Sequence, residues 1–157
     1  MTLVMAPCYG PTSPSGAHSM TQTRTVKLDI ESRFEMLDVV QTVVTHLATL
    51  VGFGEDAIHY MGVAVRESVV NAIKHGNGLD PQKRVELAFT ISEAALEVTI
   101  HDQGPGFDPD SVADPLAQEN LLKVDGRGIF FMRSFMDEVT YAFPPQGGTL
   151  VRMLKRL

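Results

Sequence analysis

A row of polar residues crosses an otherwise apolar segment of the chain. Glu67, Asn71 and His75 follow one another at intervals of four residues. On a helix this spacing brings the three side chains to one face, because residues i and i+4 lie one turn apart. An isolated Glu-x-x-x-Asn also fits the solvated stripe of an amphipathic helix, so its meaning depends on what the rest of the chain supplies.

A turn rich in glycine follows a segment that alternates like a strand. It contains Asp102, Gly104 and Gly106 within the sequence His-Asp-Gln-Gly-Pro-Gly-Phe. The two glycines let the backbone turn sharply and approach a ligand without a Cβ in the way. A buried carboxylate at the end of the strand could accept hydrogen bonds from an exocyclic amine. The alternative is an ordinary turn, in which Asp and Gly are common.

Two further glycine pairs stand before regular segments. Gly126, Arg127 and Gly128 open an apolar helical pattern, and the free N–H groups at such a start bind anions. Arg127 adds a fixed positive charge within reach of a phosphate. The second pair, Gly147-Gly148, leads through Thr149 into the last strand, and the Thr149 hydroxyl could reinforce the Asp102 contact. Either pair alone would be a turn.

The hydrophobic periodicity predicts the elements that position these motifs. Period-two alternation predicts a strand around 26–30, and the spacing of apolar residues predicts helices over 34–51 and 56–74, the second stopped by the glycines at 76 and 78. Strands are predicted at 85–91 and 96–100, joined as a hairpin, then a helix at 128–136 and strands at 139–143 and 149–154. This order predicts an α+β fold. We expect a two-layer α/β sandwich with a mixed, mostly antiparallel sheet covered on one face by helices.

Length and composition bound the class of protein. The 157 residues suit one domain, and Pro and Gly in the first 22 residues predict a flexible tail before a domain at 23–157. A net charge of −6 argues against a broad nucleic-acid surface. Cys8 is the single cysteine, which excludes an internal disulfide. With no uninterrupted apolar run long enough for a membrane span, we expect a soluble protein of the cytoplasm, with no membrane association.

The four motifs occur in a fixed order that resembles the GHKL ATPase superfamily. This is the Bergerat fold shared by gyrase-type ATPases, a class of heat-shock chaperones, histidine kinases and MutL. The resemblance covers nearly everything after the tail. Within the superfamily, VRESVVNAIKHG at 65–76 and GRGIFFM at 126–132 are most similar to the anti-sigma-factor serine kinases.

This resemblance implies a set of site residues. Asn71 would ligate Mg²⁺ between the ATP phosphates, and Glu67, one turn earlier, would be the general base for a substrate serine. Asp102 would recognise the adenine amino group with help from Thr149, while Gly104 and Gly106 shape the pocket. Gly126, Arg127 and Gly128 would surround the phosphates, and Arg127 would stabilise charge on the transferred group. The long segment 107–125 would form a lid.

The function implied by the resemblance is that of an ATP-dependent serine/threonine protein kinase and anti-sigma factor. It would bind a sigma factor, phosphorylate an antagonist of the STAS type on serine, and change partners with its nucleotide state. A homodimer is also possible in this family. The alternative is a catalytically inactive, nucleotide-gated binding module, against which the presence of both Glu67 and Asn71 argues.

Overall fold

The structure is a computed structural model, and it describes residues 23–106 and 127–157 of the chain. The predicted tail at 1–22, the predicted lid at 107–125 and Gly126 lie outside the described residues. The two described segments contain every predicted strand and helix.

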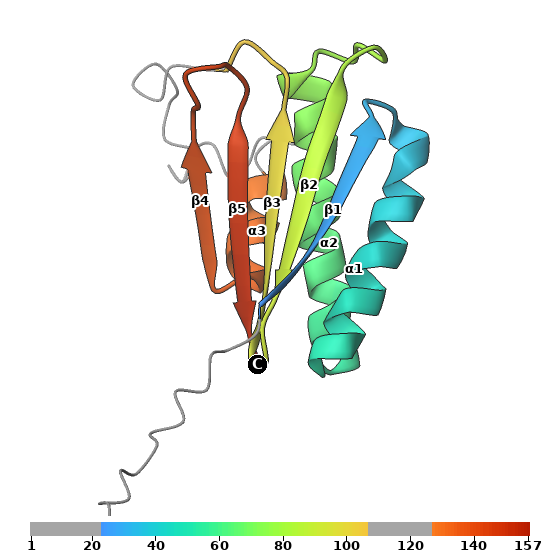
Figure 1. Cartoon of the computed structure of the whole chain (residues 1–157), viewed down its shortest axis with the longest axis vertical. Coiled ribbons are helices and arrows are strands. Elements are labelled where there is room, and N and C mark those ends of the chain that lie inside the picture. The colour runs from blue at the N-terminus through green and yellow to red at the C-terminus, as the bar shows by residue number, and fades with distance from the viewer. Residues whose placement is uncertain (1–22, 107–126) are drawn as a thin grey trace, which may run out of the picture.

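A five-stranded sheet forms one layer of the fold (Figure 1). Its order is β1 (Arg24–Glu31), β2 (Arg84–Ile91), β3 (Ala95–Asp102), β5 (Leu150–Arg156) and β4 (Glu138–Ala142). All four neighbouring pairs are antiparallel. In β3, buried and half-buried residues alternate along the whole strand, as expected for a strand with one face on the core.

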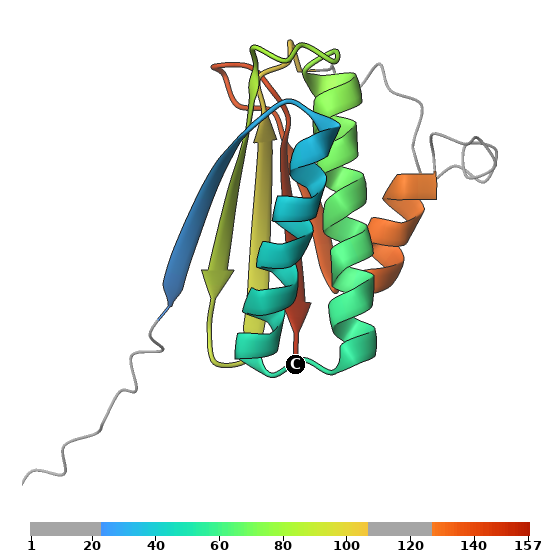
Figure 2. The ribbon, with the colours of Figure 1, turned by 90° about the vertical axis from the view of Figure 1, so that its right-hand side faces the viewer.

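The helices form the second layer and all cover the same face of the sheet (Figure 2). A 3₁₀ turn, η1 (Phe34–Met36), leads into α1 (Leu37–Val51), which is followed by α2 (Glu55–Asn71) and later by α3 (Arg127–Phe135). Helix α1 ends at Gly52, whose φ of 102° is a left-handed conformation that favours glycine. The predicted two-layer α+β sandwich is therefore confirmed.

The end of α2 differs from its predicted form. The helix changes at Ala72 into a π-helical turn, η2 (Ala72–Gly76), instead of continuing as an α-helix to Lys74. The left-handed residues that stop it are Gly78 (φ 66°) and Leu79 (φ 60°). Gly76 does not have a positive φ, so its lack of a side chain must serve another purpose.

The core lies between the sheet and the helices. Met132, Met136 and Met153 are buried there, as expected for flexible side chains that fill gaps. Residues Phe34–Val51 are long and apolar enough to span a membrane by composition, with a mean hydropathy of 1.3. In the fold, however, buried residues of α1 such as Val40 and Val44 belong to the core that the helices share with the sheet.

Candidate functional site

A cavity of about 460 Å³ opens between the helices and the sheet, near the end of β3. This volume is within the range of small-molecule sites. The helical wall comes from α2 and η2 through Asn71, Ala72 and Gly76, and from α3 through Ile129 and Met132. The motifs predicted from the sequence thus meet at one place, where α2, the end of β3 and α3 surround a single cavity.

The sheet contributes two rows of side chains to the cavity wall. The outer row, at the strand ends, consists of Asp102 and Thr149, and the inner row is formed by Ile100, Val151 and Tyr141, which are neighbours by strand register. The inner row is mainly apolar, whereas the outer row carries a carboxylate. Such a site suits a flat, largely apolar ring with a hydrogen-bond donor at its edge.

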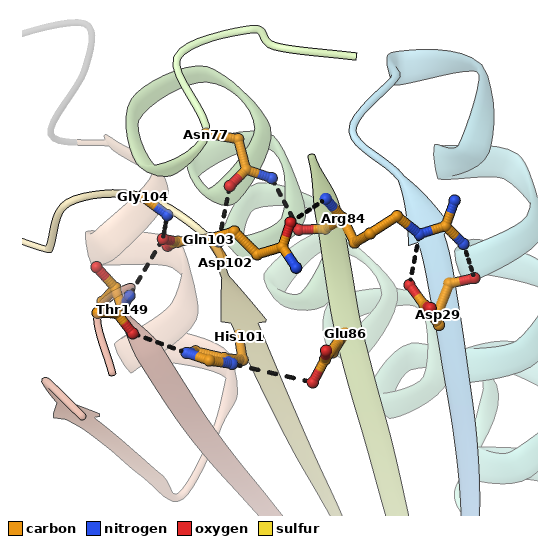
Figure 3. Close-up of polar contacts among 10 residues, drawn as sticks. Asp29, Asn77, Arg84, Glu86, His101, Asp102, Gln103, Gly104 and Thr149 are labelled. Atoms are coloured by element: carbon orange, nitrogen blue, oxygen red, sulfur yellow. Dashed lines mark hydrogen bonds and ion pairs between the residues drawn. The ribbon is translucent and has the colours of Figure 1, made fainter. Parts of the chain in front are cut away.

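The carboxylate of Asp102 is buried and held by backbone donors (Figure 3). Its Oδ1 accepts hydrogen bonds from the Gly104 N–H at 2.9 Å and the Thr149 N–H at 3.1 Å. No described residue donates a hydrogen bond to Oδ2. One oxygen therefore fixes the carboxylate, and the other can accept a bond from a ligand in the cavity.

Three glycines allow the backbone and side chains to pack closely around Asp102. A Cβ on Gly76 would lie 2.3 Å from the Asp102 Oδ2, which explains why η2 needs glycine despite its ordinary φ. A Cβ on Gly104 would lie 2.2 Å from the Gly76 carbonyl oxygen, and one on Gly148 would lie 2.0 Å from the Asp102 carbonyl oxygen. Gly104 is not itself part of the cavity wall, whereas Gly106 lines the cavity.

Thr149 contacts Asp102 through its backbone. Its N–H donates to the carboxylate, and its carbonyl oxygen accepts a hydrogen bond from the Asp102 N–H at 3.2 Å. The contact suggested by the sequence therefore exists, but it uses the main chain in place of the hydroxyl. The Thr149 residue itself lines the cavity.

Asn77 is a residue that the sequence analysis missed. It is buried after η2, where its Oδ1 accepts from the Gln103 N–H at 2.7 Å and its Nδ2 donates to the Ser32 Oγ and the Arg84 carbonyl oxygen (Figure 3). Asn77 thus ties the end of α2 to β2 and to the turn after Asp102. A polar amide within the Gly-Asn-Gly sequence, directly after a helix, was the available signal.

Glu67 and Asn71 lie together at the start of α3. A Cβ on Gly128 would lie 2.8 Å from the Glu67 Oε2 and 3.6 Å from the Asn71 Nδ2. Asn71 also lines the cavity, whereas Glu67 is outside its wall. The carboxylate and amide thus border the space beside Gly128, and the Asn71 side-chain oxygen is of the type that could ligate a Mg²⁺ ion whose other ligands are phosphates and water.

The remaining predicted residues are only partly placed. Arg127 is the first residue of α3, so its backbone stands at the helix start predicted for anion binding. His75, the third residue of the polar row, is exposed and lines the cavity beside Asn71. Among the described residues, no group of three or more His, Cys, Asp or Glu is arranged to hold a metal.

Two further residues of the cavity wall were not singled out by the sequence analysis. Ser68 and Tyr141 both line the cavity, and burial raises the pKa of Tyr141, while the nearby charge of Arg133 opposes this shift. The phenol is therefore protonated at neutral pH. Ser68 follows Glu67 in the sequence, but nothing in its local pattern distinguishes it from a core position.

The fold is that of an ATPase domain of the Bergerat type. Residues 30–155 match the model of the histidine kinase-like ATPase domain, and the chain belongs to that family. The predicted membership of the GHKL superfamily is thereby confirmed.

Several bacterial regulators are similar over most of the chain. The serine-protein kinase RsbW of Bacillus velezensis is 28% identical over 84% of this chain and 85% of its own length. The RsbW of Halalkalibacterium halodurans is also 28% identical, over 87% of this chain and 85% of its own. The anti-sigma F factor of Oceanobacillus iheyensis is 33% identical over 65% of this chain and 71% of its own.

Proposed function

We propose that the protein is an ATP-dependent serine/threonine protein kinase that also acts as an anti-sigma factor. The observation that carries this proposal is the buried Asp102 carboxylate, fixed by two backbone N–H donors at the edge of an apolar cavity beside Asn71 and Glu67. Relatives named as serine-protein kinases and an anti-sigma factor, similar over most of the chain, support the same activity.

In this proposal the cavity holds the adenine ring of ATP. The Asp102 Oδ2 accepts a hydrogen bond from the adenine amino group, and the backbone of Thr149 keeps the carboxylate in place. Gly104 and Gly106 shape the base pocket. The guanine of GTP has a carbonyl oxygen where adenine has its amino group, so the same carboxylate would repel it.

The phosphates would extend toward the start of α3. Asn71 would ligate Mg²⁺, which neutralises charge on the phosphates when bound. Gly128, at the start of α3, leaves space beside Glu67 and Asn71, while Gly126 and Arg127 complete the phosphate contacts. Arg127 would stabilise the negative charge on the γ-phosphoryl group as it is transferred.

Glu67 would act as the general base. Its carboxylate takes the proton from the serine hydroxyl of a protein substrate as that oxygen forms a bond to the γ-phosphorus. The bond between the γ-phosphorus and the bridging oxygen breaks, and ADP leaves. Positioning and charge stabilisation supply most of the rate in phosphoryl transfer, so these few groups are sufficient.

The proposed partners are proteins. They are a sigma factor and a STAS-type antagonist whose serine is phosphorylated, with the nucleotide state deciding which of them is bound. The negative net charge gives no support to direct nucleic-acid binding. We expect the protein to act in the cytoplasm without membrane association. We also propose that it can form a homodimer.

The first experiment is a calorimetric titration of the full chain with ATP, with and without Mg²⁺, and with GTP as the control. The proposal predicts saturable binding that prefers ATP and is strengthened by Mg²⁺, followed by transfer of labelled phosphate to a STAS-type protein. Binding without any transfer would favour the alternative of an inactive nucleotide-gated module. No binding at millimolar ATP would contradict both.

A further inference from the structure

His101 and Asp102 are consecutive residues of β3 whose side chains lie on opposite faces of the sheet. Asp102 is buried on the face that the helices cover, whereas His101 lies on the other face, where its side chain is 22% exposed. Both side chains contact the same segment, the loop of residues 147–149 that precedes β5 (Figure 3). The end of β3 thus holds this loop from two sides.

The His101 contact is a hydrogen bond to the backbone of the loop. The His101 Nε2 is 3.2 Å from the Gly147 carbonyl oxygen, and because a carbonyl oxygen can only accept, the imidazole donates from Nε2. On the other side of the ring, the Glu86 carboxylate on β2 lies 4.0 Å from Nδ1. His101 therefore fixes the loop two residues before Thr149, whose N–H donates to Asp102.

The loop is costly to order, so its position depends on such contacts. Gly147 (φ 97°) and Gly148 (φ 83°) are consecutive left-handed residues, and glycine loses more conformational freedom on folding than any other residue. The Gly148 N–H also donates to the Gly104 carbonyl oxygen at 2.9 Å. The packing against the imidazole is tight, since a Cβ on Gly148 would lie 2.8 Å from the His101 Nε2.

We propose that His101 is a positioning residue for recognition of the adenine base. This inference rests on the proposed function, which places the adenine amino group on the Asp102 carboxylate. By fixing Gly147, His101 keeps the Thr149 N–H at 3.1 Å from the Asp102 Oδ1, so that Oδ2 holds its position for the amino group. His101 is not among the described residues that line the cavity, so it acts on the nucleotide only through the loop.

Three substitutions of His101 test this inference by calorimetry with ATP. His101→Leu removes the donor, and ATP affinity should fall about threefold, within the range expected for one hydrogen bond. His101→Gln places an amide N–H near the position of Nε2 and should restore most of the affinity. His101→Asn places its amide near the position of Nδ1, which faces Glu86, and should bind ATP as weakly as His101→Leu.

The matched control is Thr99→Val, two residues earlier on the same face of β3, which should bind ATP like the parent. The melting temperature without nucleotide shows that each variant is folded.

A second nucleotide separates positioning from stability. Purine riboside triphosphate lacks the amino group of ATP but keeps the ring nitrogens, the ribose and the phosphates. The parent and His101→Leu should bind it about equally well, because it offers no amino group to the Asp102 carboxylate. An equal loss of affinity for both nucleotides in His101→Leu would show a merely structural role and would overturn the inference.

Unchanged ATP affinity in His101→Leu would also overturn it, as would equal affinities of His101→Asn and His101→Gln. Both results leave the proposed function intact if the parent binds ATP. Failure of the parent itself to bind ATP would overturn the proposed function together with this inference. Calorimetry of the parent therefore comes first and separates the two.

Discussion

The two ends of the candidate site are built to different degrees. At the base end, Asp102 is buried, bonded to two N–H groups and enclosed by glycines, and Asn77 secures the turn behind it. At the proposed phosphate end, the side chains of Glu67 and Asn71 make no hydrogen bond or ion pair with any described residue. The proposed base end is thus held by hydrogen bonds within the protein, whereas the side chains at the proposed phosphate end are not.

This difference suits a protein that must bind one nucleotide selectively and then respond to its phosphates. A preorganised base pocket loses little entropy on binding, so it should bind the base equally well with ATP and with ADP. Groups without fixed partners at the phosphate end can take different positions with ATP and with ADP. We therefore expect base-end substitutions to change affinity and phosphate-end substitutions to change chemistry.

The largest expected effect is at the phosphate end. Glu67→Gln keeps the size of the side chain but removes the base, so phosphotransfer should fall about 10²–10⁴-fold, the usual contribution of a general base. ATP affinity should stay within about twofold of the parent, because the base pocket is untouched. Transfer of labelled phosphate and calorimetry measure the two quantities.

The matched control for Glu67 is Glu93→Gln, which changes an exposed carboxylate in the turn between β2 and β3. It should affect neither quantity. If Glu67→Gln abolished ATP binding instead, the division of the site into a binding end and a chemical end would be wrong.

The second effect concerns the packing that holds the base end. Gly148→Ala combines a φ of 83° with a Cβ only 2.0 Å from the Asp102 carbonyl oxygen, so we expect the free energy of unfolding to fall by about 2–4 kcal/mol. Gly52→Ala is the control. Its φ is 102° but nothing lies within 4 Å of the added Cβ, so only backbone strain is added, and the free energy of unfolding should fall by about 1 kcal/mol.

Chemical denaturation of both variants measures the difference. Equal destabilisation would mean that the loop before β5 moves aside easily. The proposed base end would then not be rigid.

The third effect is on recognition. Asp102→Asn keeps the shape of the side chain but replaces one carboxylate oxygen with an NH₂ group, which cannot accept the adenine amino group. ATP binding should weaken by about 1–3 kcal/mol, roughly fivefold to 150-fold, and GTP should be affected less. Calorimetry with both nucleotides tests this, and normal ATP binding would remove Asp102 from base recognition.

The sequence was sufficient to predict the fold because each element carries its own signal. The alternation in 96–100 and the helical spacing in 56–74 are local patterns, and the antiparallel arrangement follows from their order. The π-helical turn at Ala72–Gly76 could not be predicted in this way. It depends on the close approach of Gly76 to the Asp102 carboxylate, a contact between residues far apart in the chain.

The site was predicted where residue type alone implies chemistry. Asp102 and the glycines belong to a motif, whereas the position of Asn77 depends on its contacts with Ser32, Arg84 and Gln103, which exist only in three dimensions. The contact of Thr149 with Asp102 could not be predicted either, because it is made by the Thr149 backbone N–H, and residue types carry no information about backbone contacts of this kind.

The smallest expected effect is at the opposite end of the sheet from the site (Figure 1). The Arg156 N–H, at 2.6 Å from the Asp137 Oδ2, outweighs partial burial and, with the Lys155 ammonium at 3.0 Å, holds the pKa of Asp137 below its ordinary value. The unfolded chain therefore takes up a proton more readily than the folded chain. The resulting stabilisation is complete above about pH 4 and is lost as the pH falls through the folded pKa.

Asp137→Asn removes this stabilisation without touching the site. At pH 7 the free energy of unfolding should fall by less than about 1 kcal/mol, because both side chains are partly exposed and their interaction is screened by water. The difference from the parent should shrink below about pH 4. Denaturation at several pH values measures it. ATP affinity should remain unchanged, so this variant separates a small loss of stability from a loss of binding. Weaker ATP binding in this variant would mean that the base end depends on the stability of the whole sheet. The base end could then not be regarded as preorganised independently of the rest of the molecule.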